Sequence, residues 1–133
     1  HREAIVIAAD TVVALGRRVL VKPQNSLEAE SALAMLSGRR HRVYTSVCVR
    51  SHENVRQRVV VTHVKFKKLK KSEICDYINS GEWKGKAGSY GIQGRAAAFT
   101  ISITGSYTNV VGLPLYETYS LLGSVGYLSD LEE

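Results

Sequence analysis

Hydrophobic and polar positions near the start of the chain predict a pair of strands. Ala4–Ala9 is a continuous apolar run with the length and branched composition typical of a strand covered on both faces. After two polar residues the run resumes as Val12–Leu15. The turn signal Gly16–Arg18 then predicts that Val19–Val21 returns as a hairpin partner. Lys22-Pro23 ends this strand, because proline cannot donate to a β-ladder.

A helix is expected after this hairpin. Asn25 lies three residues before Glu28, which is a capping pattern, and Ser26 is a rival cap. Apolar residues at helical spacing continue as far as Ser37. Gly38 follows at the position where a left-handed residue commonly ends a helix.

The middle of the chain predicts two neighbouring strands. Residues 43–49 alternate in polarity with a period of two, which is typical of a half-buried strand. Residues 60–66 alternate in the same way, and the loop at 51–54 suggests that the two strands are antiparallel. A short helix capped by Ser72 and ended at Gly81 is expected next.

The last third of the chain mixes both kinds of element. Residues 81–94 are rich in glycine, residues 99–103 alternate as a further strand, and residues 105–109 resemble a loop. Pro114 suits the first turn of a last helix. Strands and helices interleave through hairpins and crossovers, which predicts an α/β fold with a mixed β-sheet and flanking helices in a single domain, residues 1–133.

Composition limits the possible settings and partners. The 133 residues are 44% hydrophobic and 23% charged, which is typical of a globular protein. The net charge of +6 favours polyanionic partners such as nucleotides, nucleic acids or anionic lipid. No apolar run approaches the ~18 residues of a membrane span, so no membrane partner is expected. Cys48 and Cys75 lack metal-ligand spacing, and we expect two core thiols in a reducing, cytoplasmic setting.

Asp10 is the residue most indicative of chemistry, because an ionised carboxylate within an apolar strand needs a compensating partner. If Asp10 is functional, it is a metal ligand or a general base, and its partner is a metal, a cation or solvent at the mouth of a cleft. The alternative is a structural carboxylate bound to a backbone amide or an arginine. Lys22 ends the hairpin and is either a phosphate contact near Asp10 or a solvated lysine.

Two further segments have both functional and structural interpretations. The glycines of residues 85–94 allow backbone amides to approach a phosphate or a base, but the spacing matches neither a P-loop nor G-x-G-x-x-G. The lysines of residues 65–71 form either a nucleic-acid patch or a solvated strand end and turn.

Several stretches, taken together, resemble the Maf family of nucleoside triphosphate pyrophosphatases. In family order they are Ala9–Val13, Lys22-Pro23, Leu36–Thr45, Lys86–Gly94 and Gly105–Leu115. Each stretch is modest, but the ordered set is specific and covers almost the whole chain. The resemblance implies a Maf-like domain with a nucleotide cleft.

The resemblance also implies an activity. Members hydrolyse nucleoside triphosphates to the monophosphate and pyrophosphate with a divalent metal (Mg or Mn), as housecleaning of nucleotide pools, and founding members are associated with septum formation. The resemblance implies that Asp10 is the metal-linked base or water-orienting carboxylate, that Lys22 contacts phosphate and that Gln93 belongs to the nucleotide site. Thr11 and Lys86 are expected to line the same cleft. The Gly-Ile-Gln-Gly sequence around Gln93 resembles the branch that prefers dTTP and UTP, and the family implies a homodimer.

A non-enzymatic module that binds nucleic acid or a division protein is the alternative. Its motivation is the net charge and the run of lysines. The absence of an aromatic stacking signature argues against it, and nucleic acid is not the expected partner.

The beginning of the chain differs from the family pattern. Family members have a first strand that leads into a Ser-x-Arg-Arg phosphate-binding loop, which does not precede Asp10 here. Ser37–Arg40 fits that pattern literally, but its neighbours match a later family motif. The run from Ala4 is too hydrophobic for a free edge. We therefore expect a preceding strand and helix in the intact protein, and an open cleft with weak activity in a chain limited to residues 1–133.

Overall fold

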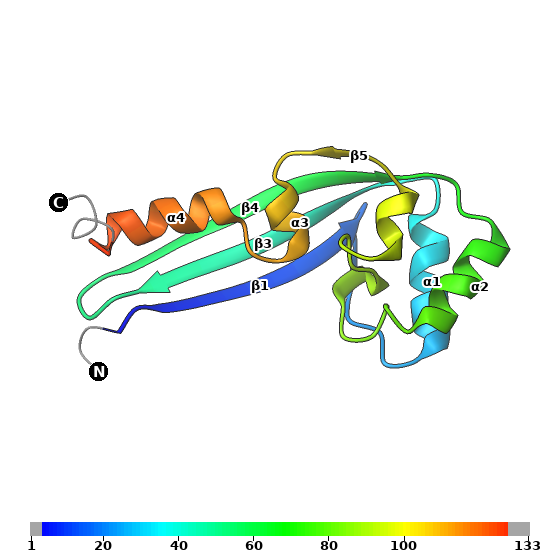
Figure 1. Cartoon of the computed structure of the whole chain (residues 1–133), viewed down its shortest axis with the longest axis horizontal. Helices are drawn as coiled ribbons and strands as arrows, with labels where there is room; N and C mark the ends of the chain where they lie inside the picture. The colour runs from blue at the N-terminus through cyan, green and yellow to red at the C-terminus, as the bar shows by residue number, and fades with distance from the viewer. Residues whose placement is uncertain (1–3, 128–133) are drawn as a thin grey trace.

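A computed structural model describes residues 4–127, which fold around a five-stranded antiparallel β-sheet (Figure 1). The strand order is β2-β1-β3-β4-β5. The strands are β1 (Val6–Leu15), β2 (Arg18–Leu20), β3 (Arg40–Arg50), β4 (Val55–Phe66) and β5 (Thr100–Thr104). The α/β class with flanking helices is confirmed. The predicted mixed sheet is wrong, since all four strand pairs are antiparallel. The period of two in the sequence shows which face of a strand a residue occupies, but it does not show the direction of the strand.

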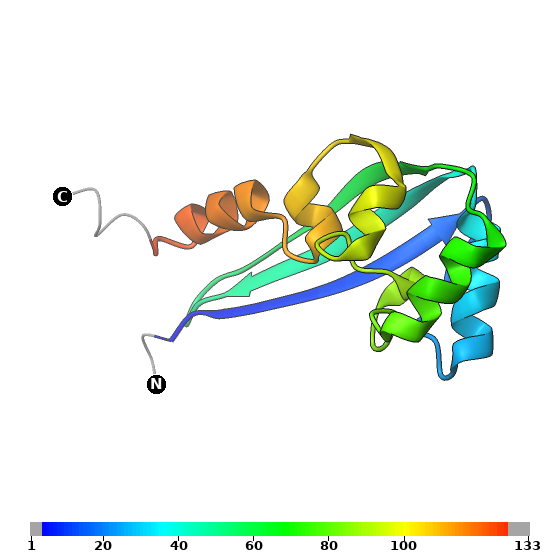
Figure 2. The same ribbon diagram turned by 45° about the vertical axis from the view of Figure 1, so that its right-hand side comes forward.

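Within residues 4–127, four α-helices and two short 3₁₀ helices accompany the sheet. They are α1 (Ser26–Leu36), α2 (Lys71–Ser80), η1 (Ala87–Ser89), η2 (Arg95–Phe99), α3 (Tyr107–Val111) and α4 (Leu115–Ser124). The helices α1 and α2 pack together at one end of the long strands, whereas α3 and α4 lie over β3 and β4 (Figure 2). None of the helices within residues 4–127 has the length and apolar character needed to cross a membrane.

The first predicted helix forms where its capping pattern placed it. Asn25 Oδ1 accepts a hydrogen bond of 2.9 Å from Glu28 N, so Asn25 rather than Ser26 caps α1. Glu28 Oε1 accepts from Gln24 N at 3.0 Å. At the other end, Gly38 adopts a left-handed φ of 68°, as predicted.

The alternating pattern of β3 is also confirmed. Val43, Thr45, Val47 and Val49 are buried on the face of β3 that α3 and α4 partly cover, while the residues between them are half-buried on the opposite face. At the other end of the sheet, the main core joins the strands to α1, α2 and the glycine-rich segment. The sheet therefore links two packed regions.

The expected burial of Ala4–Ala9 is wrong. Val6 is 56% exposed and Ile7 is 44% exposed. Only Val13–Leu15 of β1 pair with β2, so among residues 4–127 the outer edge of β1 before Val13 has no strand beside it. A continuous apolar run does not distinguish a strand covered on both faces from an edge strand.

Three smaller expectations are also corrected. Lys70, not Ser72, precedes the first turn of α2, and its amide donates to Glu73 Oε1 at 2.8 Å. Residues 105–109 are not simply a loop, because Ser106 caps the short helix α3 through a 3.1 Å hydrogen bond from the amide of residue 109. The two cysteines are free thiols, half-buried and exposed respectively, rather than core residues.

Candidate active site

A cleft of about 570 Å³ lies between β1, Lys22 beyond the end of β2, the glycine-rich loop and the end of α3. We call residues 85–94 the glycine loop. All five site residues that the sequence singled out line this cleft: Asp10, Thr11, Lys22, Lys86 and Gln93. Residues separated by up to 83 positions in the sequence therefore meet at one surface.

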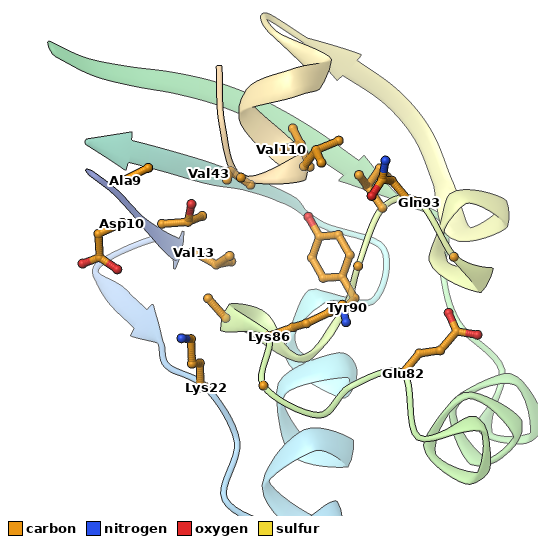
Figure 3. Close-up of a pocket in the computed structure, with 18 residues that line it drawn as sticks. Ala9, Asp10, Val13, Lys22, Val43, Glu82, Lys86, Tyr90, Gln93 and Val110 are labelled. Atoms are coloured by element: carbon orange, nitrogen blue, oxygen red, sulfur yellow. The ribbon is translucent and has the colours of Figure 1, made fainter. Parts of the chain in front are cut away.

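The side chains are spread along the cleft rather than gathered at one point. Asp10 and Lys22 lie at one end, Gln93 lies at the opposite end, and Lys86 and Tyr90 lie between them (Figure 3). Asp10 and Lys22 are both exposed. Asp10 is thus at the mouth of a cleft and not a buried partner of an amide or arginine, which settles its position while its chemical role stays a prediction.

Thr11 is held by hydrogen bonds that run across the sheet. Its Oγ1 lies 2.9 Å from Thr45 Oγ1, which in turn donates to the carbonyl of Asn109 at 3.3 Å. Asn109 is fully buried, and its Nδ2 donates to Val43 O, at 3.1 Å, and to two acceptors on β4. The wall of the cleft formed by β1 is therefore tied to β3, β4 and α3.

The glycine loop forms the other wall of the cleft, and two of its glycines make room for neighbouring side chains. A Cβ on Gly88, which has a φ of 71°, would lie 3.0 Å from Val13 Cγ1. A Cβ on Gly91 would lie 2.6 Å from Lys86 Cε, so the absence of a side chain at this position lets Lys86 lie across the loop. These contacts explain locally why glycines recur in this segment.

Tyr90 is a cleft residue that sequence reasoning missed. Its ring is buried, and its Oη lies 2.5 Å from Nε2 of His41, a residue of β3 that is 1% exposed. Burial raises the pKa of Tyr90 and lowers the pKa of His41 to about 4, so both groups are neutral near pH 7. The sequence offered no signal for this pair, because its members are 49 positions apart.

Glu82 is a second missed residue. It lines the cleft on the same side as Gln93 (Figure 3). Its Oε1 accepts a 2.9 Å hydrogen bond from the amide of Arg95. The Arg95 guanidinium Nε lies 3.4 Å from the other carboxylate oxygen. A Cβ on Gly94 would lie 2.0 Å from Glu82 Oε1. Glu82 therefore braces the end of the glycine loop. Asp10, by contrast, has no hydrogen bond or ion pair to another side chain among residues 4–127.

The other basic candidates lie outside the cleft. Lys67 forms a short ion pair with Glu73, which lowers the pKa of that carboxyl through the side-chain hydrogen bond and the nearby charges. Ser37 Oγ accepts a 2.6 Å hydrogen bond from Leu69 N and does not line the cleft. This position agrees with the prediction that Ser37–Arg40 is not the phosphate-binding loop of the family.

No group of three or more His, Cys, Asp or Glu side chains in the described part of the chain is arranged to hold a metal ion by itself. The cleft offers one uncommitted carboxylate, Asp10, and two lysines, Lys22 and Lys86. Such a set can contact an anionic ligand and share a cation with it.

Comparison with known proteins identifies the family. The family model described as Maf-like protein matches residues 1–125. A protein of Rhodopseudomonas palustris (strain ATCC BAA-98 / CGA009) named dTTP/UTP pyrophosphatase is 57% identical over 127 residues, which are 95% of this chain and 61% of that protein. A protein of Rhizobium meliloti (strain 1021) with the same name is 57% identical over 123 residues, which are 92% of this chain and 60% of that protein. This chain thus spans about three-fifths of the length of these relatives. From the match over residues 1–125 and these identities, the chain belongs to the Maf-like protein family.

Proposed function

We propose that this protein is a nucleoside triphosphate pyrophosphatase that prefers dTTP and UTP and releases the monophosphate and pyrophosphate. The observation that carries the proposal is the convergence of Asp10, Lys22, Lys86 and Gln93 on one cleft in a chain 57% identical to proteins named dTTP/UTP pyrophosphatase. Its volume of about 570 Å³ is in the range of ligand sites.

The reaction needs an activated water and fixed positive charge on the phosphate oxygens. Asp10 would accept a proton from water as the oxygen attacks the α-phosphorus. The bond to the bridging oxygen then breaks, and pyrophosphate leaves. Lys22, near Asp10, and Lys86, further along the cleft, would donate to the phosphate oxygens in this arrangement.

A divalent cation, Mg or Mn, fits these residues if the Asp10 carboxylate and the substrate phosphates bind it together. Magnesium is usually bound through one or two carboxylates together with substrate phosphates rather than by a cage of protein ligands. Asp10 is an exposed carboxylate at the cleft and would supply the protein ligand. When bound, the cation would offset the charge that develops on the phosphate oxygens.

The base preference is proposed from the opposite end of the cleft. Gln93 has an amide that both donates and accepts, which matches the adjacent carbonyl and N–H of thymine and uracil. Thr11 would complete the nucleotide contacts from the wall formed by β1, where Thr45 fixes its hydroxyl.

The proposed setting is the cytoplasm, with the protein acting as a homodimer in housecleaning of nucleotide pools. A link to septum formation is part of the same proposal and follows from the family alone. Light scattering of the purified protein measures the oligomeric state, and a monomer at all concentrations would contradict the proposed dimer.

The decisive experiment measures pyrophosphate release from a panel of dTTP, UTP, dCTP, ATP and GTP with Mg or Mn. We expect the highest kcat/KM with dTTP and UTP and no activity after chelation of the metal. Asp10→Asn should lower kcat by at least about 100-fold, in the range typical of a general base. Asp76→Asn is the matched control, because Asp76 is exposed on α2 and does not line the cleft. Unchanged activity in Asp10→Asn would refute the proposed chemistry, and a preference for purines would refute the proposed specificity.

A further inference from the structure

The conformation of the glycine loop is not determined by its own backbone and depends on contacts with the rest of the protein. Gly85 and Gly88 have φ values of 70° and 71°, in the region where glycine is free to move and other residues are not. Ser89 has a φ of 74°, a strained value for a residue with a side chain, and it is fully buried. Such strain persists only where the surrounding structure holds the residue in place.

The residues that follow this strained position supply the restraint. Tyr90 packs its ring against Phe66, with centroids 4.8 Å apart, and its hydroxyl meets His41 Nε2 at 2.5 Å. The next amide, that of Gly91, donates to Tyr77 Oη at 3.3 Å. Two tyrosine hydroxyls therefore anchor consecutive residues of the loop to the core.

The contact with His41 is the more deeply buried of these two anchors. It lies among rings, since His41 also meets Phe66 edge-on with centroids 5.0 Å apart. His41 Nδ1 is buried without a hydrogen-bond partner, so the tyrosine is the hydrogen-bond partner found for the imidazole in the described structure. A buried polar pair of this kind has one favourable geometry, because moving either partner leaves both unsatisfied.

The position of Tyr90 connects this anchor to the ligand contacts. Tyr90 comes four residues after Lys86 and three before Gln93, and all three line the same cleft (Figure 3). We propose that the His41–Tyr90 hydrogen bond is a positioning device that holds the glycine loop where Lys86 reaches the phosphates and Gln93 reaches the base. This inference rests on the proposed function and adds to it two residues that act through others.

Two variants remove the hydrogen bond. One is expected to destabilise the protein, and the other is expected to restore most of the lost stability. Tyr90→Phe keeps the ring but leaves the imidazole buried without a partner, so its melting temperature should fall. The double variant Tyr90→Phe/His41→Leu replaces both polar partners by apolar groups and should recover most of that loss. Tyr119→Phe is the matched control, since Tyr119 is 65% exposed on α4.

Each variant is assayed for KM, kcat and the ratio of kcat/KM between dTTP and GTP. A positioning role predicts that both Tyr90 variants raise KM for dTTP by about five- to tenfold, the factor set by the net worth of one hydrogen bond. The dTTP/GTP ratio should fall, and kcat should change less than KM. The double variant should keep these defects although its melting temperature recovers.

Binding is measured separately from hydrolysis with a dTTP analogue that has a methylene bridge between the α- and β-phosphorus atoms. Trp83 is the single tryptophan of the chain and precedes Lys86 by three residues, so its fluorescence reports on the loop. A wild-type KM and base ratio in the double variant would overturn the inference, as would unchanged analogue affinity. If the wild-type protein binds the analogue but hydrolyses no triphosphate, the proposed function fails and the analogue affinities still decide this inference. Absence of nucleotide binding by the wild-type protein would overturn both.

Discussion

Replacing Gly91 by alanine tests whether the glycine loop serves Lys86. The added Cβ would lie 2.6 Å from Lys86 Cε and 2.9 Å from Cδ. Carbon atoms in ordinary contact are about 3.5–4.0 Å apart, so the lysine chain has to move by about 1 Å or more. Gly91 does not have a positive φ, so alanine imposes no backbone strain there. The substitution therefore displaces a neighbouring side chain while leaving the local backbone acceptable.

The expected magnitude follows from the contact that Lys86 is proposed to make. A hydrogen bond to a charged group contributes about 1.5–3 kcal/mol, which corresponds to roughly 10- to 100-fold in kcat/KM. Because the lysine chain is flexible and recovers part of the contact, we expect the lower end, about tenfold, mostly in KM. Alanine also restricts the unfolded chain, so the melting temperature should stay equal or rise.

The assay is a double-mutant cycle on pyrophosphate release from dTTP. In the Lys86→Ala background no lysine remains to be displaced, so Gly91→Ala should have little further effect on kcat/KM. Gly123→Ala on the exposed surface of α4 is the matched control and should leave kinetics unchanged. Effects of Gly91→Ala and Lys86→Ala that multiply independently would refute the reasoning.

Two further predictions concern stability and are measured by urea unfolding. The pKa of His41 is lowered from 6.5 to about 4 by burial, so between these pH values the unfolded chain binds a proton that the folded protein excludes. The free energy of unfolding contributed by His41 should therefore fall by about 3 kcal/mol as the pH is lowered from 6.5 to 4, and His41→Leu should remove this slope; parallel pH profiles for the two proteins would contradict the prediction. Asn109→Ala removes three hydrogen bonds made by a fully buried side chain and should cost at least about 2 kcal/mol, whereas Asn79→Ala on the surface of α2 should cost less than about 0.5 kcal/mol. Equal losses in the two variants would show that the buried amide is not a support of the sheet.

The elements predicted correctly are those whose signals are local. The cap at Asn25, the left-handed Gly38, the end of a helix at Gly81 and the hairpin turn at Gly16 each depend on a few neighbouring residues. The alternation in β3 was equally legible because one face of that strand is buried. Local pattern is sufficient in these cases, since the conformations are set by backbone freedom and nearby hydrogen bonds.

The errors arose where a local pattern has two tertiary solutions. The apolar run Ala4–Ala9 reads the same for a covered strand and for an edge strand, and Val6 and Ile7 are in fact exposed. The helix at Tyr107–Val111 was missed because its polar start resembles a turn, and its burial depends on bonds that Asn109 makes to β3 and β4. These outcomes are decided by contacts between distant segments.

The candidate site divides in the same way. Asp10, Lys22 and Gln93 were assigned roles through ordered motifs, and the structure brings all three to one cleft, whereas spacing alone left their functional and structural interpretations open. Tyr90 and Glu82 were not found. Both act through hydrogen-bond partners, His41 and Arg95, and no periodicity in the sequence connects these partners to a cleft. Motifs therefore reveal residues that contact a ligand more readily than residues that position those contacting residues.

The two walls of the cleft differ in how firmly they are built, and this difference bears on the proposed reaction. The wall formed by β1 carries Asp10 and Thr11 on a strand paired along its length with β3 and tied to Asn109. The opposite wall is the glycine loop, whose anchors to the core are side-chain hydrogen bonds near Tyr90.

A rigid wall suits the group that must meet the attacking water, because small displacements there directly reduce the rate of the chemical step. An anchored loop suits the groups that select and bind the nucleotide, because its position can be changed without disturbing the sheet. On this basis, loss of the Asp10 carboxylate should appear mainly in kcat, while Gly91→Ala and Tyr90→Phe should appear mainly in KM and in the choice of base.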